Sequence, residues 1–139
     1  MKDIRFVSAD EAVSHIPSNS HVHLSSVASV PHCLIQALCR RADAGDVTGL
    51  HFHHFHTEGP APYSDPAYEG IFFEQGFFVG PNVRKNVNSG YADYLPVHLG
   101  ETPKLYYEGH IRLSAALVNV SLPDENGMVS LGTSVDCSY

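Results

Sequence analysis

The feature that most constrains the fold is a regular alternation of short strand patterns and helix patterns. Val22 to Leu24 has the pattern of a short strand that leads into a loop of small residues, and Pro31 suits the first position of a helix. Leu34 and Leu38 would share one face of that helix, and another strand pattern follows from Val47 to Phe55. This alternation predicts an α/β fold with a mostly parallel sheet flanked by helices.

The rest of the chain continues the alternation, and its 139 residues fit a single domain over 1–139. Ile111 to Val120 is the strongest strand pattern, and its largely apolar run predicts burial on both faces. Ser8 and Glu11 form a capping-box pattern, which predicts a short helix after Ser8. The other expected elements are helices beginning near Gly80-Pro81, with Gly90 capping the end, and near Thr102-Pro103, and strands at Ile71–Phe73, Gly76–Val79, Ala92–Val97 and Met128–Leu131.

Composition and charge exclude several classes of protein. The net charge is −7, with 15 acidic against 8 basic residues, and only Arg40-Arg41 and Arg84-Lys85 are adjacent cations. Nucleic-acid binding needs a concentrated cationic face, so no nucleic-acid partner is expected. No apolar run approaches the roughly 18 residues of a membrane-spanning helix, so no membrane partner is expected either. The three cysteines lack paired metal-type spacing and suit free thiols, which favours the cytoplasm.

The segment HFHHFH, residues 51–56, is the densest group of potential metal ligands. In a strand, His51 and His53 would share one face, and His54 and His56 the other. A zinc site needs three or four convergent ligands, and each face supplies two. The remaining ligands would have to come from Glu58, His21 or His23. We therefore expect a strand end with hydrogen-bonded or solvated imidazoles and no metal, and keep a histidine-dependent metal protein as an alternative.

Two loops carry patterns suited to an anionic ligand. The loop from Ser25 to Ser29 consists of small residues and precedes Pro31, so a ligand could approach the backbone and the first amides of the helix. Gly80-Pro81-Asn82 has a similar pattern, although Pro81 lacks one of the amides. A plain strand-to-helix connection explains either loop equally well.

No nucleophile motif is present. Cys33 and Cys39 fall within an amphipathic helix pattern, where cysteine is usually a small buried residue. There is no Gly-x-Ser-x-Gly elbow and no glycine-rich phosphate loop. The carboxylates of interest, which in loops would be solvated, are Glu58, Glu74, Asp124 and Glu125. The residues alone indicate an α/β domain with an anion-compatible loop.

Three sequence blocks resemble the acetyl-CoA hydrolase and CoA-transferase family, and most closely its 4-hydroxybutyrate CoA-transferases. These blocks are SLPDENGMVSLGTSVD (121–136), FFVGPNVRKNVNSGYADYLPVHLGETP (77–103) and HFHHFHTEGPAPY (51–63). They occur in the order found in the family. The segment Ser18–Ser20 departs from the pattern, because relatives usually carry a Gly-Asp turn there.

The resemblance implies a longer protein with two similar α/β halves, of which this chain is the N-terminal one. Gly132 to Asp136 follows a strand pattern as though a helix should come next, and we expect the fold to be incomplete. The family moves coenzyme A from an acyl-CoA to a small carboxylic acid, such as 4-hydroxybutyrate or acetate, through a glutamyl-CoA thioester. That glutamate belongs to the second half, so no catalytic residue is assigned here.

The resemblance also sets the expected ligands and partners. Coenzyme A and acyl-CoA are substrates, no cofactor is tightly bound, and the partners are a small carboxylate, the C-terminal half and other copies in a homo-oligomer. The alternatives are an acetyl-CoA hydrolase of the same family and a non-catalytic subunit that pairs with a separate catalytic half. Contacts to substrate carboxylate or CoA are expected from Ser26, Ser29, Thr57, Asn82, Ser130 and Gly132.

Overall fold

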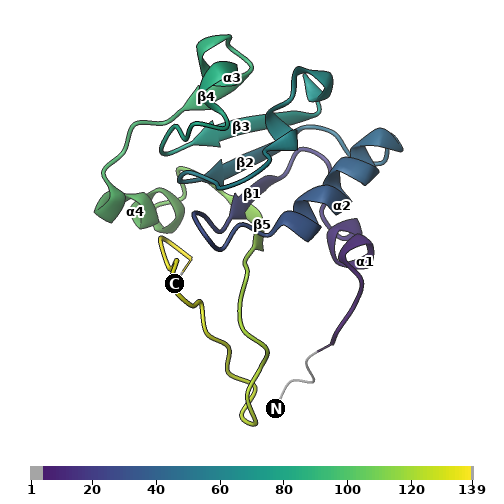
Figure 1. The fold of residues 1–139 in the computed structure, drawn as a ribbon, viewed down its shortest axis with the longest axis vertical. Coiled ribbons are helices and arrows are strands. Elements are labelled where there is room, and N and C mark those ends of the chain that lie inside the picture. Colours follow the sequence, from purple (N-terminus) through teal and green to yellow (C-terminus); the bar gives the residue numbers. More distant parts are fainter. Residues whose placement is uncertain (1–4, 139) are drawn as a thin grey trace.

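The computed structural model describes residues 5–138, and its centre is a parallel five-stranded sheet (Figure 1). The strand order in space is β4-β3-β2-β1-β5. The bounds are β1 His21–Leu24, β2 Leu50–His54, β3 Phe72–Gly76, β4 Ala92–Tyr94 and β5 Leu113–Leu117. All neighbouring pairs are parallel, which confirms the predicted α/β class.

The order of the strands contains one reversal. From β1 to β4 each new strand adds to the same side, and β5 then pairs with the opposite side of β1. The main helix α2 (His32–Asp43) joins β1 to β2, and α4 (Thr102–Tyr107) lies on the way back from β4 to β5. In an open parallel sheet, ligands bind outside the carboxyl ends of the strands, at such a switch point. The topology therefore directs attention to the carboxyl ends of β1 and β5.

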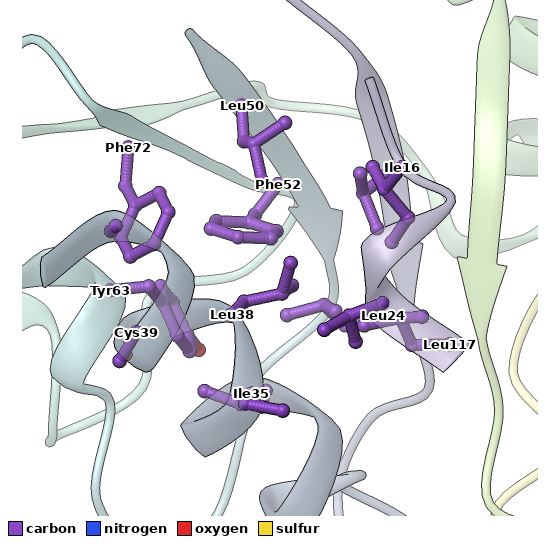
Figure 2. Packing of buried hydrophobic residues seen from close by; sticks show 14 of the residues in the cluster. Ile16, Leu24, Ile35, Leu38, Cys39, Leu50, Phe52, Tyr63, Phe72 and Leu117 are labelled. Carbon is purple, nitrogen blue, oxygen red and sulfur yellow. The ribbon is translucent and has the colours of Figure 1, made fainter. Parts of the chain in front are cut away.

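One face of the sheet, called the core face below, packs against α2 and α1 (Ala9–Ser14). Figure 2 shows Leu50 and Phe52 of β2 pointing toward Leu38 and Ile35 of α2, and all four side chains are buried. The Arg41 guanidinium, on α2, donates to the backbone carbonyl of Val13 in α1 and to that of Ile16 just after α1. These hydrogen bonds hold α1 against α2. Ser8 caps α1 by accepting from the Glu11 amide, as the capping pattern predicts.

The opposite face, called the histidine face below, has imidazoles where the core face has aliphatic chains. Parallel register sets His21 beside His51 and His23 beside His53. The rings of His21, His51 and Phe73 stack in a row, with centroids 4.7 and 4.8 Å apart. Helix α4 and the chain's last described residues cover only part of this face, around the buried cluster of Phe55, Phe77 and Ile111.

The remaining elements are short. Helix α3 spans Arg84–Asn88, and three 3-10 turns span Pro62–Ser64, Pro66–Tyr68 and Leu99–Glu101. Strand β4 lies at a sheet edge, as Pro96 just beyond it suggested, and α4 begins at Thr102 as predicted. Among residues 5–138, no helix has the length and apolar character needed to cross a membrane.

Three predicted strands need correction. Ile71–Phe73 and Gly76–Val79 are not two strands, because β3 runs continuously from Phe72 to Gly76. Residues 128–131 form no strand; they return along a loop in which the Ser130 carbonyl accepts from the Ser121 amide. This loop projects away from the sheet (Figure 1), and no strand of the described residues pairs with 128–131.

The prediction that the apolar run from Ile111 to Val120 is buried on both faces is wrong for strand β5. It occupies residues 113–117 at an edge of the sheet, and of its five residues only Leu117 is buried. Its apolar composition is thus not matched by covering elements among the described residues.

Candidate functional site at the carboxyl ends of the strands

The loop after β1 carries the chain's most unusual backbone conformation. Val27 has a φ of 54°, in the left-handed region that a β-branched residue rarely adopts. Its amide donates to the His56 carbonyl at 2.9 Å, and residues 27 and 57 form an isolated parallel bridge. This contact extends the β1–β2 pairing past the strand ends and holds Val27 in place. Backbone strain of this kind is concentrated at ligand-binding sites.

Ser26 lies in this loop but its polar groups are occupied within the protein. Its hydroxyl accepts from the Phe55 amide at 3.0 Å, and its own amide donates to an Asp136 carboxylate oxygen at 3.0 Å. The side chain is fully buried. Ser26 therefore fastens β2 and the C-terminal segment to the loop, and its position supports the site without opening onto it.

A cavity of about 460 Å³ opens at the carboxyl ends of β1, β2 and β3. Its walls are chiefly apolar, from Val27, the aromatic rings that follow β2 and β3, and two residues before α4. The C-terminal segment 133–136 closes another side with Thr133, Ser134, Val135 and Asp136. The full apolar lining is Val27, Phe55, Phe77, Phe78, Val97, Leu99 and Val135, with His56 beside them. We call this space the apolar cavity.

A second cavity, of about 330 Å³, lies at the switch point beyond β1 and β5. It is lined by Ser29, Ser130 and Gly132, three residues that the sequence predicted to contact a ligand. Thr133 lines this switch-point cavity and the apolar cavity alike. The two spaces are therefore neighbours, and one extended ligand could reach from one into the other.

Thr57 and Asn82, two further predicted contacts, meet each other instead of either cavity. The Thr57 hydroxyl accepts from the Asn82 amide nitrogen at 3.1 Å and lies 2.9 Å from the Tyr63 hydroxyl. Burial raises the pKa of Tyr63, so the phenol stays neutral. Gly80 leaves room for this contact, because a Cβ there would lie 2.8 Å from the Asn82 side-chain oxygen. Both predicted residues brace the loop that follows β2.

Beneath this network lies a buried pair that the sequence did not reveal. Glu74 belongs to β3 and is buried, which corrects its earlier grouping with solvated loop carboxylates. Its oxygen lies 3.4 Å from Nε2 of His54, and both side chains are at most 1% exposed. The His54 Nδ1 is 2.5 Å from the Phe55 carbonyl and donates to it. Alternation along β2 and β3 could have suggested this pair, since His54 and Glu74 both fall on the core face.

On the histidine face, imidazoles contact one another. Nδ1 of His21 lies 2.8 Å from Nε2 of His53. Burial, reinforced by the neighbouring imidazoles, lowers the pKa of His53 to about 3, so this ring is neutral at ordinary pH. Burial lowers the pKa of His23 too, although Asp136 acts in the opposite direction.

The ring nitrogens of His23 are engaged by Tyr106 at 3.1 Å and Ser138 at 2.9 Å. His23, Asp136 and Cys137 place potential metal ligands within 4.8 Å of one another, but burial and Asp136 raise the pKa of Cys137 to about 12, which disfavours the thiolate that binds metals.

Comparison with known proteins shows the family of this chain. Residues 3–139 match the family described as acetyl-CoA hydrolase/transferase N-terminal domain. The chain belongs to that family. The switch-point cavity is lined in part by residues 121–136, one of the sequence blocks that resemble the family, and in part by the loop after β1.

Curated relatives carry related names. The succinyl-CoA:acetate/propanoyl-CoA:succinate CoA transferase of Fasciola hepatica is 38% identical over 127 residues, 91% of this chain and 26% of the relative. The 4-hydroxybutyrate coenzyme A transferase of Clostridium kluyveri is 35% identical over 132 residues, 95% of this chain and 30% of the relative. The chain thus spans less than a third of the length of these enzymes.

Solved structures agree with the fold. RipA from Yersinia pestis superposes with a TM-score of 0.81 at 28% identity, over 91% of this chain and 31% of RipA. A 4-hydroxybutyrate CoA-transferase from Porphyromonas gingivalis gives a TM-score of 0.63 at 27% identity, over 91% of this chain and 27% of that enzyme. The acetyl-CoA hydrolase/transferase family is therefore supported by sequence and by fold.

Proposed function

We propose that this chain forms an acyl-CoA-binding wall of a CoA-transferase, which moves coenzyme A between an acyl-CoA and a small carboxylic acid. The observation that carries the proposal is the pair of adjoining cavities at the carboxyl ends of the strands, which share Thr133. An acyl-CoA has an apolar acyl end and a long polar carrier. The apolar cavity suits the acyl end, and the switch-point cavity, although Val120 and Leu131 also line it, presents serine hydroxyls that could contact the carrier. The acyl group would occupy the apolar cavity, and the carrier would pass Ser29, Ser130 and Gly132.

The covalent step requires a group outside the described site. Among the described residues, no cysteine, lysine or glutamate lines the apolar cavity, and its one acid, Asp136, accepts from the Ser26 amide and the Ser138 hydroxyl. Glu58, beyond the cavity, is exposed and lies 3.5 Å from His56. In the proposed reaction a glutamate from the C-terminal half attacks the thioester carbon and displaces the coenzyme A thiolate, which leaves an acyl-glutamyl anhydride. The thiolate then attacks the glutamyl carbonyl carbon of this anhydride, forms the glutamyl thioester and releases the first acid as a carboxylate. The acceptor carboxylate then reverses these steps. This chain would orient the acyl group and exclude water from it.

The exposed apolar side chains support a partner for the loop after β5. Leu122 and Met128 are 81% and 67% exposed, at the end of a loop that projects from the body. The C-terminal half of the enzyme, and further copies of the chain in an oligomer, are the partners we propose for this surface.

Two measurements test the proposal. Exchange of labelled acetate into acetyl-CoA should be absent with this chain alone and should appear when the C-terminal half is added. Exchange by the chain alone would contradict the assignment of the nucleophile to the other half.

Binding can be tested without catalysis. Val135→Trp fills the apolar cavity, and we expect it to weaken butyryl-CoA binding at least tenfold in calorimetry. Val129→Trp is the matched control, because Val129 is similarly exposed, 47% against 41%, but does not line either cavity. Equal affinities for the two variants would contradict the placement of the acyl group.

A further inference from the structure

The charges around the apolar cavity are distributed unevenly. Among the described residues that line it, none is lysine or arginine, and Asp136 is an acid with a side chain only 7% exposed. The only lining side chain that can carry a positive charge is His56, and Glu58 lies 3.5 Å from its Nε2. A negative charge placed in this cavity would face an acid and have no dedicated cation.

The depth of the cavity is apolar. Phe55 and Phe77, which form its floor, are 8% and 3% exposed, and Phe78 stands at the side with its ring edge toward His56. A carboxylate that left water for this environment would lose its hydration and would meet hydroxyls but no lysine or arginine among the described lining residues, which does not compensate the burial of a full charge. A methyl or hydroxyl end would not be penalised in this way, since it is uncharged and Thr133 and Ser134 line the same wall and carry hydroxyls.

None of the described lysine and arginine side chains lines the apolar cavity, and several are held elsewhere. Arg40 pairs with Asp10 at 2.7 Å, Arg41 binds the carbonyls near α1, and Lys104 pairs with Glu101 at 2.6 Å. Lys85 lines a different, polar cavity beside Asn82 and Tyr91. None of these can neutralise a carboxylate in the apolar cavity without leaving its place.

We propose that the apolar cavity selects acyl groups that end without charge, such as butyryl and 4-hydroxybutyryl, against those that end in a carboxylate, such as succinyl. This inference rests on the proposed function, because it assigns a preference to the same site. The two curated relatives illustrate this choice of acyl group, since one is named for succinyl-CoA and the other for 4-hydroxybutyrate. The specificity lies in the presence of Asp136 and in the absence of a lysine or arginine among the described residues that line the cavity.

The test is a set of dissociation constants measured by calorimetry for the full chain at pH 8 with butyryl-CoA, 4-hydroxybutyryl-CoA and succinyl-CoA. We expect both uncharged acyl groups to bind at least tenfold more tightly than succinyl. Succinyl-CoA binding as tightly as butyryl-CoA would overturn the inference and leave the proposed function standing. Failure of all three to bind would overturn the proposed function itself, and the inference with it.

A gain of charge makes the test sharper. Leu99 lines the cavity and is 64% exposed, so Leu99→Lys adds a cation without disturbing the core. We expect it to narrow the preference against succinyl at least threefold. Leu122→Lys is the matched control, since Leu122 is 81% exposed and does not line the cavity, and it should leave the preference unchanged. The same ratio in both variants would overturn the inference.

Discussion

The two faces of the sheet are made by alternate residues of the same strands, yet they differ in what they contact. On β2, Leu50 and Phe52 are fully buried against α2, whereas His51, between them, is only half-buried and stacks on Phe73, which is 41% exposed. The core face holds the fold together by burying apolar area. The histidine face is polar and partly open. The two sides of one sheet thus differ in how far they are buried, and the candidate site lies where the strands end.

The largest expected effect comes from the core face. Phe52 is fully buried and contacts Tyr63 and Phe72, so Phe52→Ala should reduce the free energy of unfolding by about 3–5 kcal/mol. Urea denaturation would measure it. Phe78→Ala, at a side chain that is 55% exposed, is the comparison and should cost far less. Similar losses of unfolding free energy in Phe52→Ala and Phe78→Ala would contradict the distinction between the core and the candidate site.

Acid should destabilise the fold through the histidine face and not through the core face. Because the pKa of folded His53 is about 3 and the ordinary value is about 6.5, the unfolded chain binds more protons between these limits. Stability is therefore fully present above pH 6.5 and falls as the pH drops toward 3. One such group contributes a slope of up to about 1.4 kcal/mol per pH unit, or about 2–3 kcal/mol from pH 6.5 to 4.5.

The slope can be assigned by substitution. His53→Asn should flatten the pH dependence of the free energy of unfolding, while His98→Asn, at an exposed position, should leave it as it is. Thermal denaturation across this pH range would measure both. A wild-type slope in His53→Asn would show that other groups control the acid response.

The buried His54–Glu74 pair offers a smaller and more local test. Glu74→Leu keeps most of the volume but removes the oxygen 3.4 Å from His54, leaving a buried imidazole nitrogen without a polar neighbour. The expected loss is about 1–3 kcal/mol. Glu74→Gln retains a polar group at this place and should recover much of the loss in the same denaturation experiment. A leucine variant as stable as wild type would mean that the pair contributes nothing to the fold.

The smallest effect is expected on the open part of the histidine face. Phe73→Ala removes a ring that stacks on His51 and is 41% exposed, and we expect a loss below about 1 kcal/mol. Denaturation with the chain as a monomer would measure it. A loss as large as that of Phe52→Ala would show that this face is covered in solution.

Much of the fold was predictable because its signals are local. The strand before Ser25, the helix after Pro31 and the capping box at Ser8 depend on neighbours in sequence, and all are found. The apolar run at 111–120 was misleading, because composition indicates what a strand could bury and not what lies beside it. The strand predicted at residues 128–131 is absent for a related reason, because an apolar pattern becomes a strand only when a neighbouring strand pairs with it.

The candidate site was predictable in part. Ser29 was chosen from the loop after β1, and Ser130 and Gly132 from one distant segment, and all three line one cavity. Whether they contact a ligand stays a prediction. Ser26, Thr57 and Asn82 hydrogen-bond within the protein, and whether they also contact a ligand stays a prediction. The sequence does not distinguish a polar side chain that meets a ligand from one that braces a loop. The aromatic floor at Phe55 and Phe77 escaped notice, because its two residues look like ordinary core until the strand ends are known.

The pairing of β1 with β5 has a consequence for how the molecule is made. Its register joins His21 to Leu113, so the closing contact of the sheet spans most of the chain, whereas β1–β2 and β2–β3 join nearer segments. Distant pairings form slowly, because loop closure must precede any gain from the contact. The first four strands can associate during synthesis, while the switch-point cavity has no second wall until β5 has emerged from the ribosome. The candidate site is therefore among the last parts of this chain to form.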